Sequence, residues 1–202
     1  MMPTGHTWAT TRRRIAVILL TGLCMAAHTT QSLGAIVVAM RSNTTNIALP
    51  VKQNGEVVFT LVGSLTNSSK KAARLSVLDS WRVISLNDAA DIVQPGHSRD
   101  FLRDLTPQDC PLIKSHQTFH IKILCKIKRV EEGWVLEIGD GVGGSWAQEI
   151  HPGRMKFCLV YQFVPSGPVQ MIANSKFNFK NSEFWEGVAV SNWEDIEYRS
   201  AK

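Results

Sequence analysis

Two segments of this chain alternate between an apolar set and a more polar set of residues. From residue 119 to residue 128, the apolar set is Phe119, Ile121, Ile123, Cys125 and Ile127. The intervening positions are His120, Lys122, Leu124, Lys126 and Lys128. From residue 155 to residue 163, every second position is again apolar, namely Met155, Phe157, Leu159, Tyr161 and Phe163. A strand places successive side chains on opposite faces, so this period of two predicts antiparallel strands packed on one side.

Shorter stretches with strand composition lie at residues 56–61, 81–86, 134–138 and 188–190, and Phe177 and Phe179 keep the same spacing. Turn residues separate them at Pro95-Gly96, Pro152-Gly153 and Glu131-Glu132-Gly133, the last of which predicts a hairpin over residues 119–138. A single helix within residues 65–79 is compatible with the spacing of Ala72, Ala73 and Leu75. The sequence therefore predicts one all-β or β-dominated domain over residues 35–202, folded as an antiparallel sandwich or small barrel.

The first 34 residues have the layout of a secretory signal peptide. Three arginines, Arg12 to Arg14, precede the apolar run Ile15 to Ala27, which is short for a membrane span. Ser32 and Gly34 give the small residues that favour cleavage after Gly34, although Ala26 and Ala27 offer an earlier site. The chain is therefore predicted to be secreted, with an uncleaved membrane anchor as the alternative.

Loss of this segment changes what the net charge implies. The full chain carries a formal charge of +5, and residues 1–34 hold three arginines and no acid, so the remainder carries +2. The sequence pI of about 9.2 consequently overstates how basic the exported domain is. A specific nucleic-acid partner is not predicted from this balance.

The clearest charge pattern is the lysine face of residues 119–128. Lys122, Lys126 and Lys128 share one side of the predicted strand, and residues 112–130 contain no acid. One interpretation is a binding surface for an acidic protein, an acidic glycan or an anionic lipid surface. The other is an edge strand, on which lysines prevent edge-to-edge aggregation.

Two late tryptophans are predicted to add to a partner-binding surface. Trp185 and Trp193 lie among charged residues in a stretch without regular alternation, so we expect them to be exposed. An exposed indole suits a sugar or a membrane interface.

Three cysteines follow the predicted signal peptide, which favours one disulfide and one remaining thiol in an oxidising compartment. Cys125 falls on the apolar face and is predicted to be a buried thiol, whereas Cys158 falls on the opposite face from Phe157 and is predicted to pair with Cys110. Asn43 and Asn67 begin N-glycosylation sequons, which predict glycans if the source is eukaryotic.

Sequence patterns that carry familiar chemistry are incomplete here. Gly139 to Gly144 satisfies a dinucleotide-binding glycine pattern, but Pro152 and Gly153 follow too soon for the helix that this site needs, so an inter-strand loop is predicted. Ser145 lies in an incomplete nucleophile motif. Three further pairs are more consistent with surface residues than with metal or glycosidase sites. They are His116 with His120, Glu131 with Glu132, and Glu137 with Asp140. No catalytic residue, metal ligand or cofactor is predicted.

Three functions remain after these exclusions. The favoured one is a secreted, non-enzymatic interaction protein, such as a host-directed virulence effector that binds a protein or glycan. The first alternative is a membrane-binding β-sandwich that resembles a cytolysin in acting on anionic lipid. The second alternative is a secreted hydrolase that uses Ser145 or an acidic pair.

Overall fold

The computed structural model describes residues 36–78, 80–93, 96–98, 106–141, 143–163, 179 and 183–200. The predicted signal peptide and the Phe177 position lie outside the described residues, as does Pro95 of the first predicted turn. Nothing in the described part forms a helix long and apolar enough to cross a membrane.

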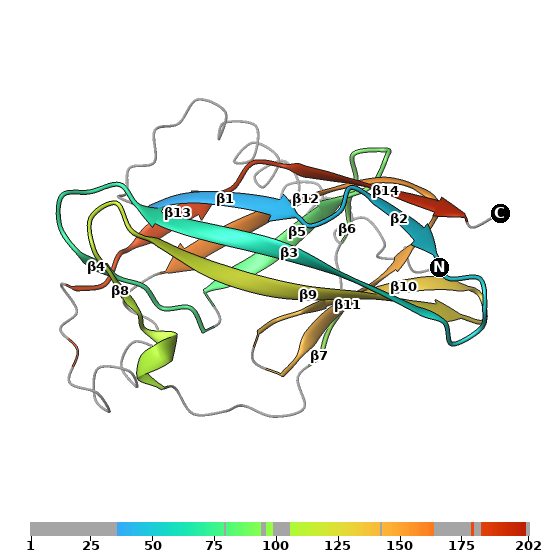
Figure 1. The fold of residues 1–202 in the computed structure, drawn as a ribbon, viewed down its shortest axis with the longest axis horizontal. Helices are drawn as coiled ribbons and strands as arrows, with labels where there is room; N and C mark the ends of the chain where they lie inside the picture. The colour runs from blue at the N-terminus through green and yellow to red at the C-terminus, as the bar shows by residue number, and fades with distance from the viewer. Residues whose placement is uncertain are drawn as a thin grey trace, which may run out of the picture. The chain divides into compact units, whose positions relative to one another are not determined.

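The first of two large sheets, sheet A, contains six strands in the order β1-β3-β9-β10-β11-β7, and every pair in it is antiparallel. Figure 1 shows its long strands β3 and β9 lying side by side on the near side of the domain. The bounds are β1 Ile36–Ser42, β3 Glu56–Asn67, β9 Thr118–Val130, β10 Gly133–Gly139, β11 Ser145–Ile150 and β7 Gly96–Ser98.

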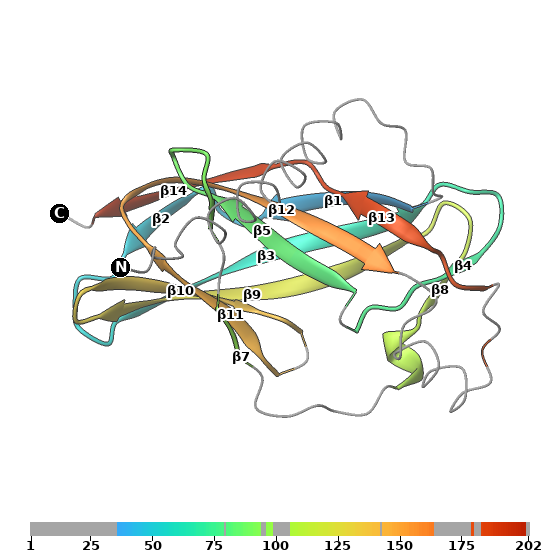
Figure 2. The same ribbon diagram turned by 180° about the vertical axis from the view of Figure 1, so that it is seen from behind.

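The second sheet, sheet B, runs β2-β14-β12-β5-β6, with β13 also paired to β12. Figure 2 shows β12 and β5 on the near side when the domain is seen from behind. The β2–β14 pair is parallel and the other pairs of this sheet are antiparallel. The bounds are β2 Asn46–Leu49, β14 Glu194–Ser200, β12 Gly153–Phe163, β5 Trp81–Leu86, β6 Ile92–Val93 and β13 Gly187–Val190.

A small third pairing joins β4 (Ala73–Arg74) to β8 (Leu112–Ile113), next to the 3-10 turn η1 (Pro107–Asp109). The described residues contain no α-helix. The predicted class is therefore confirmed: the domain is β-dominated, with curled, mainly antiparallel sheets in a sandwich-like arrangement.

The core lies between the two sheets, where their apolar faces meet. The approach is close at Gly63 of β3, because a Cβ atom there would overlap Leu159 Cδ2 of β12. Polar and aromatic contacts also cross the interface: Ser85 Oγ donates to Gln148 Oε1 at 2.9 Å, and the rings of Trp81 and Trp146 lie 5.5 Å apart.

Alternation predicted the long strands and the hairpin correctly, because β9 and β10 pair up to Val130 and Gly133 around a two-residue turn. The prediction of a helix within residues 65–79 is wrong. Strand β3 extends to Asn67, and the chain then turns because the buried Asn67 amide donates to the carbonyl oxygens of Lys71 and Ile113. Ala73 and Arg74 form β4 instead.

The disulfide predicted between Cys110 and Cys158 is not formed. Cys110, Cys125 and Cys158 are buried, and none of these three described cysteines is bonded to another. The prediction assumed that β12 is covered on one face only, yet Phe157, Cys158 and Leu159 are all inaccessible to solvent. Cys158 therefore lies within a strand buried on both faces rather than beneath an outer loop. The buried Cys125 thiol is confirmed.

Candidate functional site

The lysine face of β9 is part of the outer surface of sheet A. Ile121, Ile123 and Ile127 point into the core, which directs Lys122, Lys126 and Lys128 outward. β9 lies between β3 and β10, so the edge-strand interpretation is wrong. These lysines do not protect an open backbone edge, because both edges of β9 are already paired.

Strand register determines which residues adjoin each lysine. Arg41 of β1 lies opposite Val62 of β3, and Val62 lies opposite Lys122 of β9. We call Arg41, Val62 and Lys122 the cationic row. Adjacent strands are about 4.8 Å apart, so the Cα atoms of Arg41 and Lys122 are roughly 10 Å apart. Both side chains are exposed, and neither has an ion-pair partner in the described part of the chain.

The other two lysines have acidic neighbours from other strands. Lys126 Nζ lies 3.5 Å from Glu56 Oε2 of β3, and Lys128 Nζ lies 2.7 Å from Glu137 Oε1 of β10. The hydrogen bond to Glu137 raises the pKa of Lys128 above its usual range. We call these four residues the paired lysines and their partners. Two of the three lysines of the predicted lysine face are therefore neutralised.

Two exposed apolar side chains lie on the same face: Leu124 is the next outward residue after Lys122 on β9, and Val58 of β3 lies opposite the paired Lys126. Leu124 and Val58 are 52% and 54% exposed, which is high for residues of their size in the middle of a sheet. Gly139 of β10 approaches the backbone of Leu124, since a Cβ atom at Gly139 would lie 3.3 Å from the Leu124 carbonyl oxygen. His120 is the next outward residue beyond Lys122 on β9, and its Nδ1 lies 3.0 Å from Ser64 Oγ. The face thus combines two unneutralised cations with exposed apolar surface.

Trp185 is not part of this face. Trp185 is only 7% exposed and its ring lies 5.4 Å from that of Tyr161, so its predicted exposure is wrong. Burial follows from β-bridge pairing of Phe184 with Arg74 and from the Trp185 N–H bond to the Arg74 carbonyl, which fix this segment against the core. Trp193 is half-buried between β13 and β14.

The two sequons differ sharply in accessibility. Asn43 is exposed at the end of β1, where its Oδ1 accepts a hydrogen bond from the Thr60 N–H at 2.9 Å. Asn67 has no solvent exposure, and its Nδ2 donates two hydrogen bonds to backbone carbonyls. A glycan on Asn67 is incompatible with this fold, whereas glycosylation of Asn43 stays a prediction.

The glycine-rich segment after β10 is the predicted inter-strand loop. The Asp140 and Gly144 backbones share a hydrogen bond, and Asp140 Oδ1 accepts a second one from the Gly144 N–H at 2.8 Å. β11 begins at Ser145, so no helix follows that could direct backbone amides at a phosphate or build a nucleophile elbow.

The remaining candidate pairs have structural roles or separate positions. Glu137 binds Lys128, and Asp140 is buried in its loop, so these acids do not form a pair poised for glycoside hydrolysis. His116 sits in a turn with a φ of 60°, whereas His120 lies on β9. Within the described residues, no group of three His, Cys, Asp or Glu side chains is arranged to hold a metal ion.

No protein-family model fits the chain, and a search of curated proteins finds no similar one. The fold and the exposed face define a sandwich-like β domain with a mixed apolar and cationic surface. Arg41, Val62 and Leu124 are the members of this surface that the site prediction missed. Alternation alone could have placed Leu124, but the pairing of β1 with β3 has no local sequence signal.

Proposed function

We propose that this chain is a secreted, non-enzymatic interaction protein that binds an acidic protein or glycan with the cationic row and Leu124. The observation that carries this proposal is that Arg41 and Lys122 are exposed, adjoin the same valine and have no acidic partner in the described structure. Charges of one sign on a common face attract a partner of the opposite sign and accelerate its association.

The apolar part of the face supports contact rather than long-range attraction alone. Leu124 and Val58 together offer surface that a partner can remove from water, at about 25 cal/mol per Å². Burial of Arg41 and Lys122 without counter-charges would be unfavourable, so the partner must supply anionic groups at these positions. This requirement selects acidic proteins and polyanionic glycans over neutral surfaces.

Secretion is part of the same proposal and rests on residues 1–34, whose arginines and apolar run are typical of an export signal. Delivery to the outside is consistent with a host-directed effector. Burial of Trp185 removes one of the two aromatic anchors that the membrane-binding alternative requires.

The test compares two double variants that remove the same formal charge. Arg41→Gln/Lys122→Gln removes the cations of the row, and Lys126→Gln/Lys128→Gln removes the paired lysines. The assay measures retention on immobilised heparin at about 0.1 M salt, where charges more than about 10 Å apart are largely screened. We expect the heparin to retain the wild type and to release the row variant. The paired-lysine variant should lose much less of its retention.

Equal loss in both variants would show that only total charge matters and would contradict the proposed site. Capture from a candidate host extract with wild type and the row variant then distinguishes the partner classes. A protein retained by wild type alone identifies an acidic protein partner, and loss of capture after glycan digestion identifies a glycan. Retention on anionic vesicles but on neither of these materials would support the membrane alternative instead.

A further inference from the structure

His120 lies on the outer face of sheet A, next to the cationic row. It is exposed and comes two residues before Lys122 on β9, so the two side chains point to the same side of the sheet. The rise of a strand places their Cα atoms roughly 7 Å apart. The register puts His120 opposite Ser64 of β3, and Ser64 opposite Ala39 of β1. His120 is therefore the group that can add a third positive charge to Arg41 and Lys122.

One hydrogen bond orients the imidazole ring. His120 Nδ1 lies 3.0 Å from Ser64 Oγ. The hydroxyl can donate to Nδ1 of the neutral ring and can accept from the Nδ1–H group of the protonated ring, so the contact is compatible with both forms. Within the described residues His120 makes no other hydrogen bond. In the protonated ring, Nε2 carries an N–H group and is available to bind an anion.

The charged groups nearest to His120 are cations. On β9 its outward neighbours are Thr118 and Lys122, and the nearest charged residue across β3 is Arg41 of β1. β10 pairs with residues 125–130 of β9, so its side chains do not adjoin His120. No carboxylate in the described part of the chain forms an ion pair with His120. A proton on His120 therefore adds to the positive potential of the row instead of neutralising an acid of the domain.

We propose that His120 is a further anion-binding residue beside the cationic row, and that its protonation strengthens binding of the acidic partner as the pH falls from about 8 to about 5. The inference rests on the proposed function, because it concerns the same face and the same partner. An imidazole gains its proton within this pH range. A bound anion favours the protonated ring, so the binding of the partner and the binding of the proton are coupled in both directions.

The test is isothermal titration calorimetry of the wild type with a heparin-derived oligosaccharide, at pH 8 and at pH 5.5. The sulfate esters of this probe stay ionised over the whole range, so a change in affinity comes from the protein. We expect binding to be about two- to fivefold tighter at pH 5.5, which is the range for one additional exposed charge pair. Near pH 6.5, binding should take up a fraction of a proton, seen as a binding enthalpy that depends on the ionisation enthalpy of the buffer.

Two variants at residue 120 assign the effect. His120→Gln should lose both the gain in affinity at low pH and the proton uptake. His120→Arg carries a permanent charge, so it should bind at pH 8 about as tightly as the wild type does at pH 5.5. Residue 120 is exposed, so thermal unfolding of both variants should match that of the wild type.

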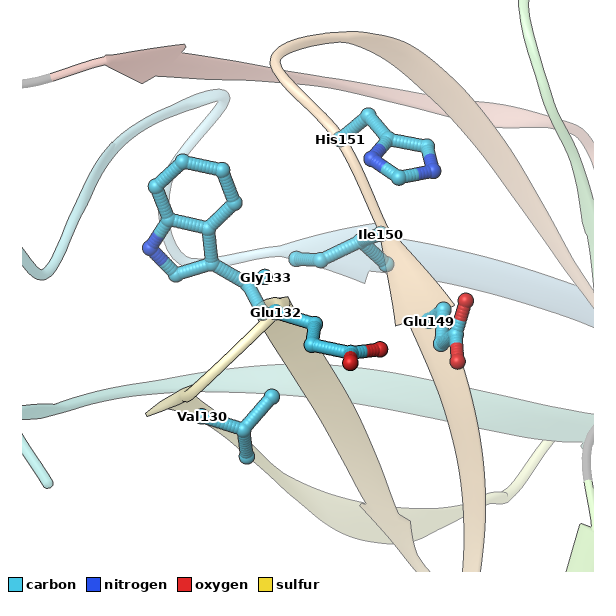
Figure 3. A pocket seen from close by; sticks show the side chains of 7 residues that line it. Val130, Glu132, Gly133, Glu149, Ile150 and His151 are labelled. Atoms are coloured by element: carbon cyan, nitrogen blue, oxygen red, sulfur yellow. The ribbon is translucent and has the colours of Figure 1, made fainter. Parts of the chain in front are cut away.

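His151→Gln is the matched control, because it also removes one exposed imidazole. The register places this residue near Arg129, at the other end of β9 from His120. It lines a small cavity there together with Glu132 and Glu149 (Figure 3), and these neighbours are acids rather than cations. This variant should keep the pH dependence and the proton uptake of the wild type.

Two results would overturn the inference, and they have different consequences for the proposed function. If His120→Gln keeps the pH dependence of the wild type, the inference fails, and the proposed function stands as long as Arg41→Gln/Lys122→Gln abolishes binding. If the wild type binds the oligosaccharide at neither pH, both the inference and the assignment of the cationic row fail.

Discussion

The two faces of sheet A are made by alternate residues of the same strands, yet different interactions organise them. On the inner face, Gly63 and Leu159 pack so closely that a Cβ atom at residue 63 would overlap Leu159 Cδ2. On the outer face, side chains contact water, and the differences among them come from charge. Lys126 and Lys128 have carboxylate partners, whereas Arg41 and Lys122 have none in the described structure. We therefore expect inner-face changes to affect stability and outer-face changes to affect binding.

The largest expected effect concerns the thiols. Burial raises the pKa of Cys125 to about 12 and, with the nearby Asp109 charge, that of Cys110 to about 11, so both resist thiolate formation at pH 8. Alkylation by iodoacetamide should be slower in the folded protein than in denaturant by a factor on the order of 10³. Mass spectrometry after denaturation without reductant should show that Cys110, Cys125 and Cys158 are all modified. A Cys110–Cys158 disulfide would leave only Cys125 modified among these three.

The second effect tests the close contact between the sheets. Gly63→Val adds three carbon atoms where Leu159 leaves no space, and overpacking of this kind costs roughly 1–3 kcal/mol. Chemical denaturation should show this loss, and Leu159→Ala should recover part of it when combined with Gly63→Val. The neighbouring outward substitution Val62→Thr should change the free energy of unfolding by no more than about 0.5 kcal/mol. Equal effects at residues 62 and 63 would contradict the distinction between the faces.

The third effect concerns β1, the edge strand of sheet A. The Asn192 side chain binds the backbone of Met40 on β1 twice: its Oδ1 accepts from the Met40 N–H and its Nδ2 donates to the carbonyl, both at 3.0 Å. Asn192→Ala should lower the free energy of unfolding by about 1–2 kcal/mol, as measured in urea, and expose an unpaired stretch of β1. Asn192→Asp keeps the acceptor alone and should have an intermediate effect, and a more stable Asn192→Ala protein would contradict this role.

The smallest effect is that of a single ion pair on the outer face. Lys128→Gln should reduce stability by about 0.5 kcal/mol at pH 7, because the Lys128–Glu137 pair is partly exposed. The pair raises the pKa of Lys128 above 10.5 in the folded state, so its contribution is complete below that pH and is lost as the pH rises through the folded-state pKa. Urea denaturation of both proteins from pH 7 to pH 11.5 should show the difference shrinking only above about pH 10.5. A difference that grows with pH would contradict the assignment.

Much of the fold could be predicted because the responsible signals are local. Alternation in residues 119–128 and 155–163 marks which side chains are buried, and the Glu131-Glu132-Gly133 turn lies between strands that adjoin in sequence. The helix prediction failed because Asn67 turns the chain through bonds to Lys71 and Ile113, and the latter is 46 residues away. The disulfide prediction failed because alternation does not report how many faces of a strand are covered.

By itself, the sequence determined that the domain is β-rich and that Lys122, Lys126 and Lys128 point away from the core, because a one-residue shift would bury three ammonium groups. Only the tertiary structure decided that β9 is an interior strand, that Glu56 and Glu137 neutralise two of these lysines, and that Arg41 adjoins the third. The physical reason is that side-chain direction follows from neighbours in sequence, whereas charge compensation depends on strands that pair across long separations in the chain.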